Sequence, residues 1–129
     1  MSEKLEKIRW KGILPIIRKA PNWATFPWAI MDVFKPINIR SDWKILCRPI
    51  ELKKRLSEDK ILIVIIGQIK PLKTIWAHYK ILVAHDEEKG WGFVDPAQHE
   101  PLISWEDNLS FTQKWNNLGR ILISVYPNG

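Results

Sequence analysis

His78 and Asp95 are the residues of this chain whose types and spacing best suit joint chemistry. His78 opens one segment with a strand-like pattern and Asp95 closes the next, and the stretch 86–90 between the two segments predicts a tight turn. In such an antiparallel hairpin, residues whose numbers sum to about 174–176 face each other, so His78 and Asp95 should be near neighbours. A carboxylate beside an imidazole fixes the tautomer of the ring and stabilises its protonated form, as a base and its orienting group require. The alternative is two strand-end residues that make only local hydrogen bonds.

The chain has one cysteine, Cys47. A single thiol forms no internal disulfide and no cysteine-rich zinc site, so an oxidised, secreted scaffold is not expected. A lone cysteine is usually a small buried apolar residue, but it becomes a nucleophile when a histidine activates it. We expect no metal and no other cofactor.

The histidine and the aspartate must be positioned by a sheet. Ile61–Ile66 is a continuous aliphatic run, typical of a central strand that is buried on both faces. The other predicted strands are His78–His85, Trp91–Asp95, Arg120–Tyr126 and a proline-containing edge strand over Ile13–Ile17. A loop is predicted over Gly67–Ala77.

Helices are expected to cover this sheet. The predicted helices are Phe26–Phe34, capped by Asn22 or Thr25 and ended by Pro36, then Pro49–Leu56, and a third from an N-cap at Ser104 to about Trp115. Residues 37–48 have an irregular pattern, and residues 1–11 suit a short helix or a loose arm. The predicted fold class is α+β, with an N-terminal helical lobe packed on a mostly antiparallel sheet.

Length and composition predict one globular domain over residues 1–129. Apolar side chains make up 46% of the chain, which excludes a disordered polypeptide. The net charge is +6, and residues 1–60 hold 14 basic and 7 acidic side chains. This basic half could attract nucleic acid, anionic lipid or an acidic protein, or it could be only a solvated surface. No nucleic-acid-binding motif is visible, and no apolar segment is long enough to cross a membrane.

From Ile50 onward, the chain resembles the papain-like cysteine peptidases, specifically the bacteriocin-processing peptidases that act on double-glycine leaders. The shared features are a helix leading into a hydrophobic strand, an HY pair followed by apolar residues, an acidic turn and a strand ending in DP. The segments that carry them are Glu51–Leu56, Ile61–Gly67, His78–Val83 and Trp91–Pro96, with Ile103–Asp107 and Gly119–Val125 as further similar stretches. The resemblance implies a papain-like fold. It makes His78 the general base and Asp95 its orienting carboxylate.

The family's nucleophile is a cysteine at the start of the first long helix, where the helix dipole and the histidine lower its pKa. Aligned on Asn22, that position is Ala24 in this chain, and aligned on Pro27 it is Thr25. The family also uses a glutamine shortly before the cysteine to bind the oxyanion. The first glutamine of this chain is Gln68.

The leading hypothesis is therefore a degenerate papain-like domain that binds a peptide or protein without cleaving it. Trp23, Trp28 and Trp76 would line an aromatic peptide groove, or would only fill the space of a lost active site. An alternative is an active cysteine peptidase or amidase whose nucleophile was changed at position 24 or 25, or is supplied by Cys47.

A third possibility is a small basic interaction domain with only a fold-level likeness to the family. A separation of His78 and Asp95 beyond about 6 Å would favour it. The charged N-terminus has no apolar core of a signal peptide, so we expect a cytoplasmic protein without membrane insertion.

Overall fold

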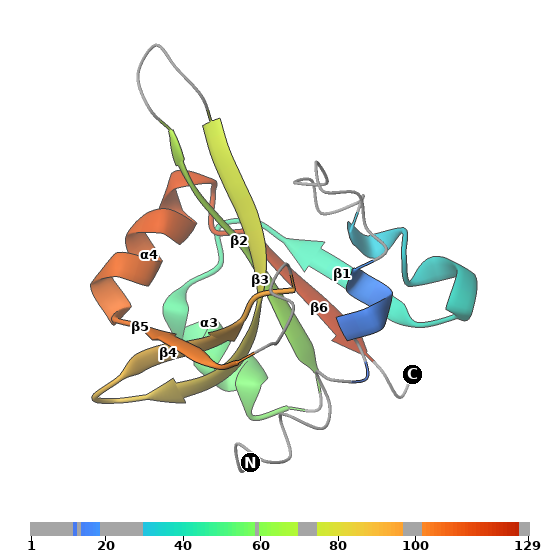
Figure 1. Cartoon of the computed structure of the whole chain (residues 1–129), viewed down its shortest axis with the longest axis horizontal. Helices are drawn as coiled ribbons and strands as arrows, with labels where there is room; N and C mark the ends of the chain where they lie inside the picture. Colours follow the sequence, from blue (N-terminus) through green and yellow to red (C-terminus); the bar gives the residue numbers. More distant parts are fainter. Residues whose placement is uncertain are drawn as a thin grey trace.

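A six-stranded antiparallel sheet forms the centre of the molecule (Figure 1). The computed structural model describes residues 12, 14–18, 30–58, 60–69, 75–96 and 102–126, and only the backbone of residues 68, 69 and 75–77. The strand order is β1-β6-β2-β3-β4-β5. The strands are β1 (Arg40–Lys44), β2 (Ile61–Ile69), β3 (Ile75–Asp86), β4 (Gly90–Val94), β5 (Ser104–Glu106) and β6 (Leu122–Tyr126). The helices with assigned bounds are η1 (Lys35–Ile37), α3 (Pro49–Leu56) and α4 (Asn108–Asn117). The predicted α+β class and antiparallel sheet are confirmed.

Each face of the sheet is covered by its own apolar core. Because side chains of a strand alternate between faces, Ile61, Ile63 and Ile65 of β2 enter one core, while Leu62, Val64 and Ile66 enter the other. The first core is completed by residues of the N-terminal region, including Leu14, Ile17, Ile30 and Phe34. The second is completed by Leu52 of α3 with Phe111 and Trp115 of α4. The chain thus packs in three layers, with β2 buried on both faces as predicted.

The predicted edge strand over Ile13–Ile17 is wrong, because Leu14–Ile17 is helical. Leu14 and Ile17 are one helical turn apart and both buried, while Pro15 between them is exposed. The short apolar run therefore fits one helical turn as well as it fits a strand.

Residues 37–48 are also more regular than predicted. Arg40–Lys44 forms β1, which pairs with β6 along its whole length, from Arg40 opposite Tyr126 to Lys44 opposite Leu122. The strand is polar because it lies at the sheet edge, so the sequence lacks the apolar alternation that marks half-buried strands. Upstream, the helical turn at Ile30 and Met31 ends before Pro36, which itself lies within η1.

The third helix begins later than predicted. Ser104 is not its N-cap but the first residue of β5, which pairs with β4. The N-cap is Asp107, whose Oδ2 accepts a hydrogen bond from the Ser110 N–H at 3.0 Å. Both residue types are good N-caps, and tertiary pairing with β4 decides between them.

The β3–β4 hairpin has the predicted turn, and β3 is longer than predicted. Asp86 Oδ1 accepts hydrogen bonds from the Glu88 and Lys89 N–H groups at 2.8 and 2.9 Å. Gly90 has φ +95°, and a Cβ there would lie 2.2 Å from the Glu106 carbonyl oxygen. β2 extends to Ile69 and β3 begins at Ile75, so residues 67–69 and 75–77 of the predicted loop over Gly67–Ala77 are strand, and residues 70–74 lie outside the described residues.

Two of the tryptophans, Trp91 and Trp115, are fully buried in the core under α3 and α4. Each ring N–H has an acceptor, at 2.9 Å on Asn108 and 2.8 Å on the Ile121 carbonyl. Part of the high tryptophan content therefore builds this core. Within the described part of the chain, no helix has the length and apolar character needed to cross a bilayer.

Candidate active site

His78 and Asp95 meet at one end of the sheet, with 2.8 Å between His78 Nε2 and Asp95 Oδ1. Their side chains are 26% and 19% exposed, so the pair is partly desolvated yet within reach of a ligand. The prediction that His78 and Asp95 are near neighbours is confirmed. The contact also argues against the reading in which they lie more than 6 Å apart.

The hairpin places the two side chains. His78 is the fourth residue of β3, and its backbone pairs with Ile66 on the central strand β2. On the other side of β3, the pairing with β4 ends at Ile81 opposite Val94, so Asp95 is the first residue beyond the strand. Pairing with the buried strand β2 thus fixes the position of His78. Asp95 supplies the carboxylate from the position just beyond the end of β4.

This arrangement can support a general base. A carboxylate only accepts hydrogen bonds, so the contact places the imidazole proton on Nε2 and leaves Nδ1 as the basic nitrogen of the neutral ring. When Nδ1 takes up a proton, Asp95 stabilises the resulting imidazolium. The pair therefore has the chemistry of a base and its orienter.

The pKa of Tyr79, the residue after His78, is affected by burial and by Asp95. Burial raises the pKa of the Tyr79 phenol, and the nearby Asp95 carboxylate raises it further. The Tyr79 and His78 rings lie with their centroids 5.9 Å apart and their planes 25° apart. The raised pKa therefore favours the neutral form of the Tyr79 phenol.

Arg18 connects the N-terminal region to this end of the sheet. Its Nε donates a hydrogen bond to the Pro96 carbonyl at 3.0 Å, across 78 residues of sequence. Pro96 directly follows Asp95, so the bond holds the segment that carries the carboxylate. No local pattern in the sequence marks Arg18, because its partner is contributed by the distant hairpin.

The predicted nucleophile positions Ala24 and Thr25 lie outside the described residues, as do the predicted groove residues Trp23 and Trp28. Trp76 lies on β3 with its backbone opposite Gln68 of β2, two residues before His78, and its side chain is not described. The aromatic groove therefore stays a prediction.

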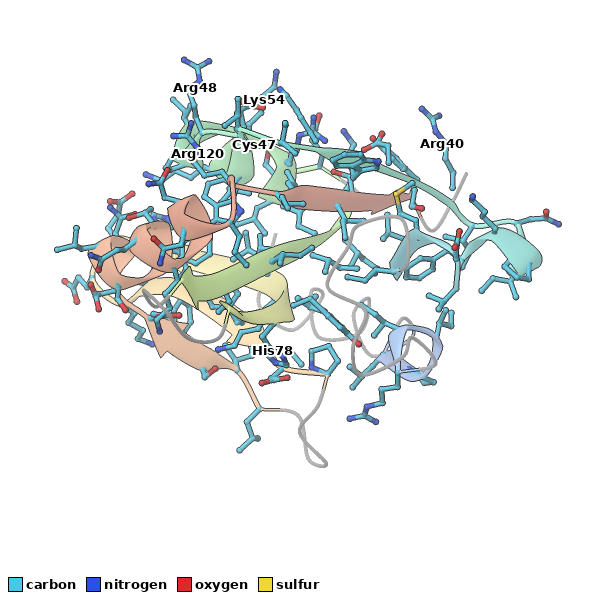
Figure 2. All side chains as sticks on the ribbon, turned by 90° about the horizontal axis from the view of Figure 1, so that it is seen from above. Arg40, Cys47, Arg48, Lys54, His78 and Arg120 are labelled. Carbon is cyan, nitrogen blue, oxygen red and sulfur yellow. The ribbon has the colours of Figure 1, made fainter. Side chains whose placement is uncertain are left out.

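Cys47 is not brought to His78. It is fully buried in the core under α3 and α4, and Figure 2 shows the two labelled residues on opposite sides of the molecule. Burial is the main cause of a raised pKa of the Cys47 thiol, and the Glu51 carboxylate adds to it. A buried, protonated thiol across the molecule does not serve the His78 base, which counts against Cys47 as the nucleophile. The ordinary role of a lone cysteine, as a small buried side chain, describes it better.

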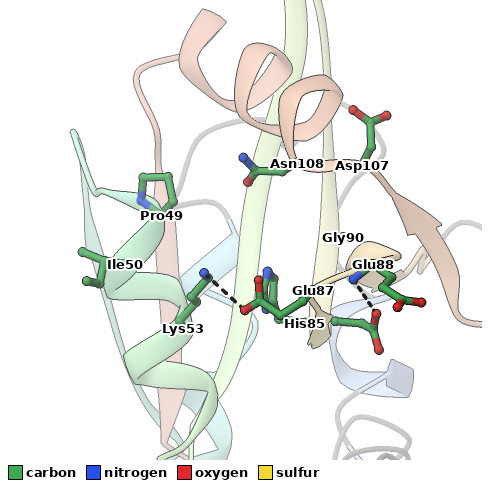
Figure 3. Close-up of a pocket in the computed structure, with 10 residues that line it drawn as sticks. Pro49, Ile50, Lys53, His85, Glu87, Glu88, Gly90, Asp107 and Asn108 are labelled. Carbon is green, nitrogen blue, oxygen red and sulfur yellow. Dashed lines mark hydrogen bonds and ion pairs between the residues drawn. The ribbon is translucent and has the colours of Figure 1, made fainter.

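A separate cavity of about 440 Å³ lies at the other end of β3, between α3, the β3–β4 turn and α4 (Figure 3). Its acidic lining residues are Asp86, Glu87, Glu88 and Asp107, and Lys53 of α3 makes an ion pair of 3.9 Å with Glu87. Neither His78 nor Asp95 lines this cavity. His85, which does, is seven residues along the strand from His78, or about 23 Å at the usual rise.

Comparison with solved structures identifies the fold. Over 75% of its length, the chain superposes on a Bacillus anthracis protein assigned as a C39-like peptidase, with a TM-score of 0.60 and 16% sequence identity. The fold is that of a papain-like cysteine peptidase. The alignment covers 56% of the other protein, so the chain spans about half the length of that peptidase.

No protein-family model matches the chain, and a search of curated proteins found no relative. At 16% identity, the likeness to the peptidase establishes the architecture but not the chemistry.

Proposed function

We propose that this chain is a papain-like domain that binds an extended peptide or protein segment beside His78 and does not hydrolyse it. The observation that carries the proposal is the His78–Asp95 contact in a chain with no cysteine before Cys47. The base and its orienter are retained, while the thiol that would form the acyl intermediate is missing from the N-terminal region.

Without a nucleophile, the covalent route is closed. The base can accept a proton only from a group that then attacks the scissile carbonyl, and neither Ala24 nor an unactivated threonine supplies such a group. The first 46 residues also contain no glutamine to stabilise an oxyanion. The absence of both groups supports a binding role more strongly than the absence of one of them would.

Selection of binders from a random peptide library tests this function. Selected peptides should bind the wild-type chain and shift the NMR signals of the His78 ring. His78→Gln should weaken binding, while the matched variant His85→Gln, on the same strand, should not. Equal binding by both variants would show that the ligand lies elsewhere.

The retained base makes an active cysteine peptidase or amidase the second candidate, with its nucleophile altered at position 24 or 25. Ala24→Cys and Thr25→Cys should then each be assayed for hydrolysis of the selected peptides. Activity that appears in one variant and disappears when His78→Gln is added would show that the site needs only its thiol. If neither variant gains activity, the site has lost more than the nucleophile.

A further inference from the structure

The Asp95 carboxylate lies just beyond the part of the chain that the sheet fixes. The pairing of β3 with β4 ends at Ile81 opposite Val94, so the sheet holds Val94 but does not reach Asp95. Pro96 follows, and a proline has no N–H with which to continue the pairing. The position of the carboxylate therefore depends on what holds the backbone at Pro96.

Arg18 holds that backbone from a distant part of the chain. Its Nε donates a hydrogen bond of 3.0 Å to the carbonyl of Pro96, which is a buried residue. A hydrogen bond from a charged donor is about twice as strong as one from a neutral donor. Loss of this donor would also remove a partner from a carbonyl in a buried part of the chain, which costs further free energy.

The backbone of Arg18 is itself fixed. Its N–H donates to the Leu14 carbonyl at 3.1 Å, which closes the N-terminal helical turn. Leu14 and Ile17 of this turn are 5% and 0% exposed and belong to the same apolar core as Val94. One helical turn thus shares a core with the residue before Asp95 and bonds to the residue after it.

His78 is placed without help from Arg18. Its backbone pairs with Ile66 of the central strand β2. Loss of the Arg18 bond would therefore release the Asp95 carboxylate and leave the His78 ring where it is. The two side chains are 2.8 Å apart, so a displacement of the carboxylate by about 1 Å would break their hydrogen bond.

We propose that Arg18 is a positioning residue of the His78 site, which keeps the Asp95 carboxylate against His78 by holding the Pro96 carbonyl. Because the contact orients the His78 ring, a peptide that binds beside His78 should need Arg18 as well. This second part rests on the function proposed above, whereas the first concerns the contact alone. Docking of the N-terminal helical turn is thereby coupled to the order of the site.

The ring N–H signal of His78 in NMR spectra of the full chain tests the first part. A ring proton that is held in a hydrogen bond exchanges slowly with water, so the wild-type chain should show the Nε2–H signal, which His78→Gln identifies. Arg18→Met, which keeps the aliphatic stem but has no donor, should lose the signal. Arg18→Lys, which retains a cationic donor, should recover part of it. The indole N–H signal of Trp115, bonded to the Ile121 carbonyl, should persist in every variant and shows that each one is folded.

Arg48→Met is the matched control. It removes the same charge at a residue that Figure 2 shows on the opposite side of the molecule from His78, and it should keep the ring signal. The positioning role would be overturned by a ring signal that is unchanged in Arg18→Met, lost equally in both variants, or absent from the wild-type chain.

Binding of the library-selected peptides tests the second part. Arg18→Met should bind them about tenfold more weakly than the wild-type chain, the effect of losing one well-placed hydrogen bond, and Arg48→Met should bind almost as the wild type. If no peptide binds the wild-type chain, the proposed function fails, and the ring signal alone then decides the role of Arg18. Peptide binding by Arg18→Met at the wild-type level would overturn the link between Arg18 and the ligand.

Discussion

The Nε2 of His78 and the Oδ1 of Asp95 lie 2.8 Å apart across the β3–β4 hairpin, and the two residues are 17 positions apart in the sequence. The contact joins a residue fixed within the sheet to one at a strand end that Arg18 holds through Pro96. The His78 and Asp95 side chains are therefore positioned by three separate parts of the chain.

The pKa of each tyrosine should depend on the aspartate beside it. Burial raises the pKa of both Tyr79 and Tyr126, with further contributions from Asp95 and from a hydrogen bond to Asp42. Asp95→Asn should lower the pKa of Tyr79 only, and Asp42→Asn that of Tyr126 only. Each pKa should stay above the usual value of about 10, because burial remains. Ultraviolet titration of each single-tyrosine variant measures this, and an unmoved Tyr79 would mean that Asp95 lies farther away.

The raised pKa values of Tyr79 and Tyr126 also affect the stability of the fold at alkaline pH. A phenol whose pKa is higher in the folded state stays neutral there while the unfolded chain ionises. The contribution of the two tyrosines to the free energy of unfolding should therefore be constant below about pH 9 and fall as the pH rises through 10 and beyond. Urea denaturation at stepwise higher pH checks this. Tyr79→Phe should flatten the decline, and a steeper one would contradict the sign.

Cys47 should resist modification in the native state. Burial shields its sulfur and raises its pKa, so a thiol reagent should react orders of magnitude more slowly with the folded chain than with the chain in urea. Labelling kinetics followed by mass spectrometry measure the ratio. Rapid native labelling that His78→Ala abolishes would instead support Cys47 as a nucleophile.

Alanine substitutions at Gly90 and Gly119 distinguish the free-energy cost of a positive φ from the cost of a steric clash. Gly90 and Gly119 both have positive φ, but only Gly90 has atoms where a Cβ would lie, at 2.2 Å from the Glu106 carbonyl oxygen. Gly119→Ala should cost about 1 kcal/mol, and Gly90→Ala at least about 2 kcal/mol because β5 must move. Chemical denaturation gives both values. Equal costs would show that the hairpin does not pack on β5 as closely as described.

The start of α4 can be tested by its caps. Asp107→Ala should destabilise the chain by about 1 kcal/mol, since the Ser110 N–H loses its acceptor. Ser104→Ala, in β5, should change stability by less than about 0.5 kcal/mol. The reverse order would favour the helix start that the sequence alone predicts.

Local signals account for what could be predicted from the sequence. The His78–Asp95 contact can be predicted because the hairpin is short and its turn is recognisable, and the irregularity between Leu82 and Ala84 shifts the register by only one residue. The Ile61–Ile66 strand can be predicted because its aliphatic run is typical of a strand buried on both faces. Leu14–Ile17 and β1 were misjudged because a single helical turn and a polar edge strand lack a distinctive period. The Arg18–Pro96 bond depends on tertiary packing, which no local pattern encodes.

The central claim is that the His78 site binds peptide and has no working nucleophile. Incubation of the wild-type chain with a random peptide library, followed by mass spectrometry of every peptide, tests it most directly. We predict that the peptides remain intact and that a subset is retained by the wild-type chain but not by His78→Gln. Cleavage products that disappear with His78→Gln would contradict the claim.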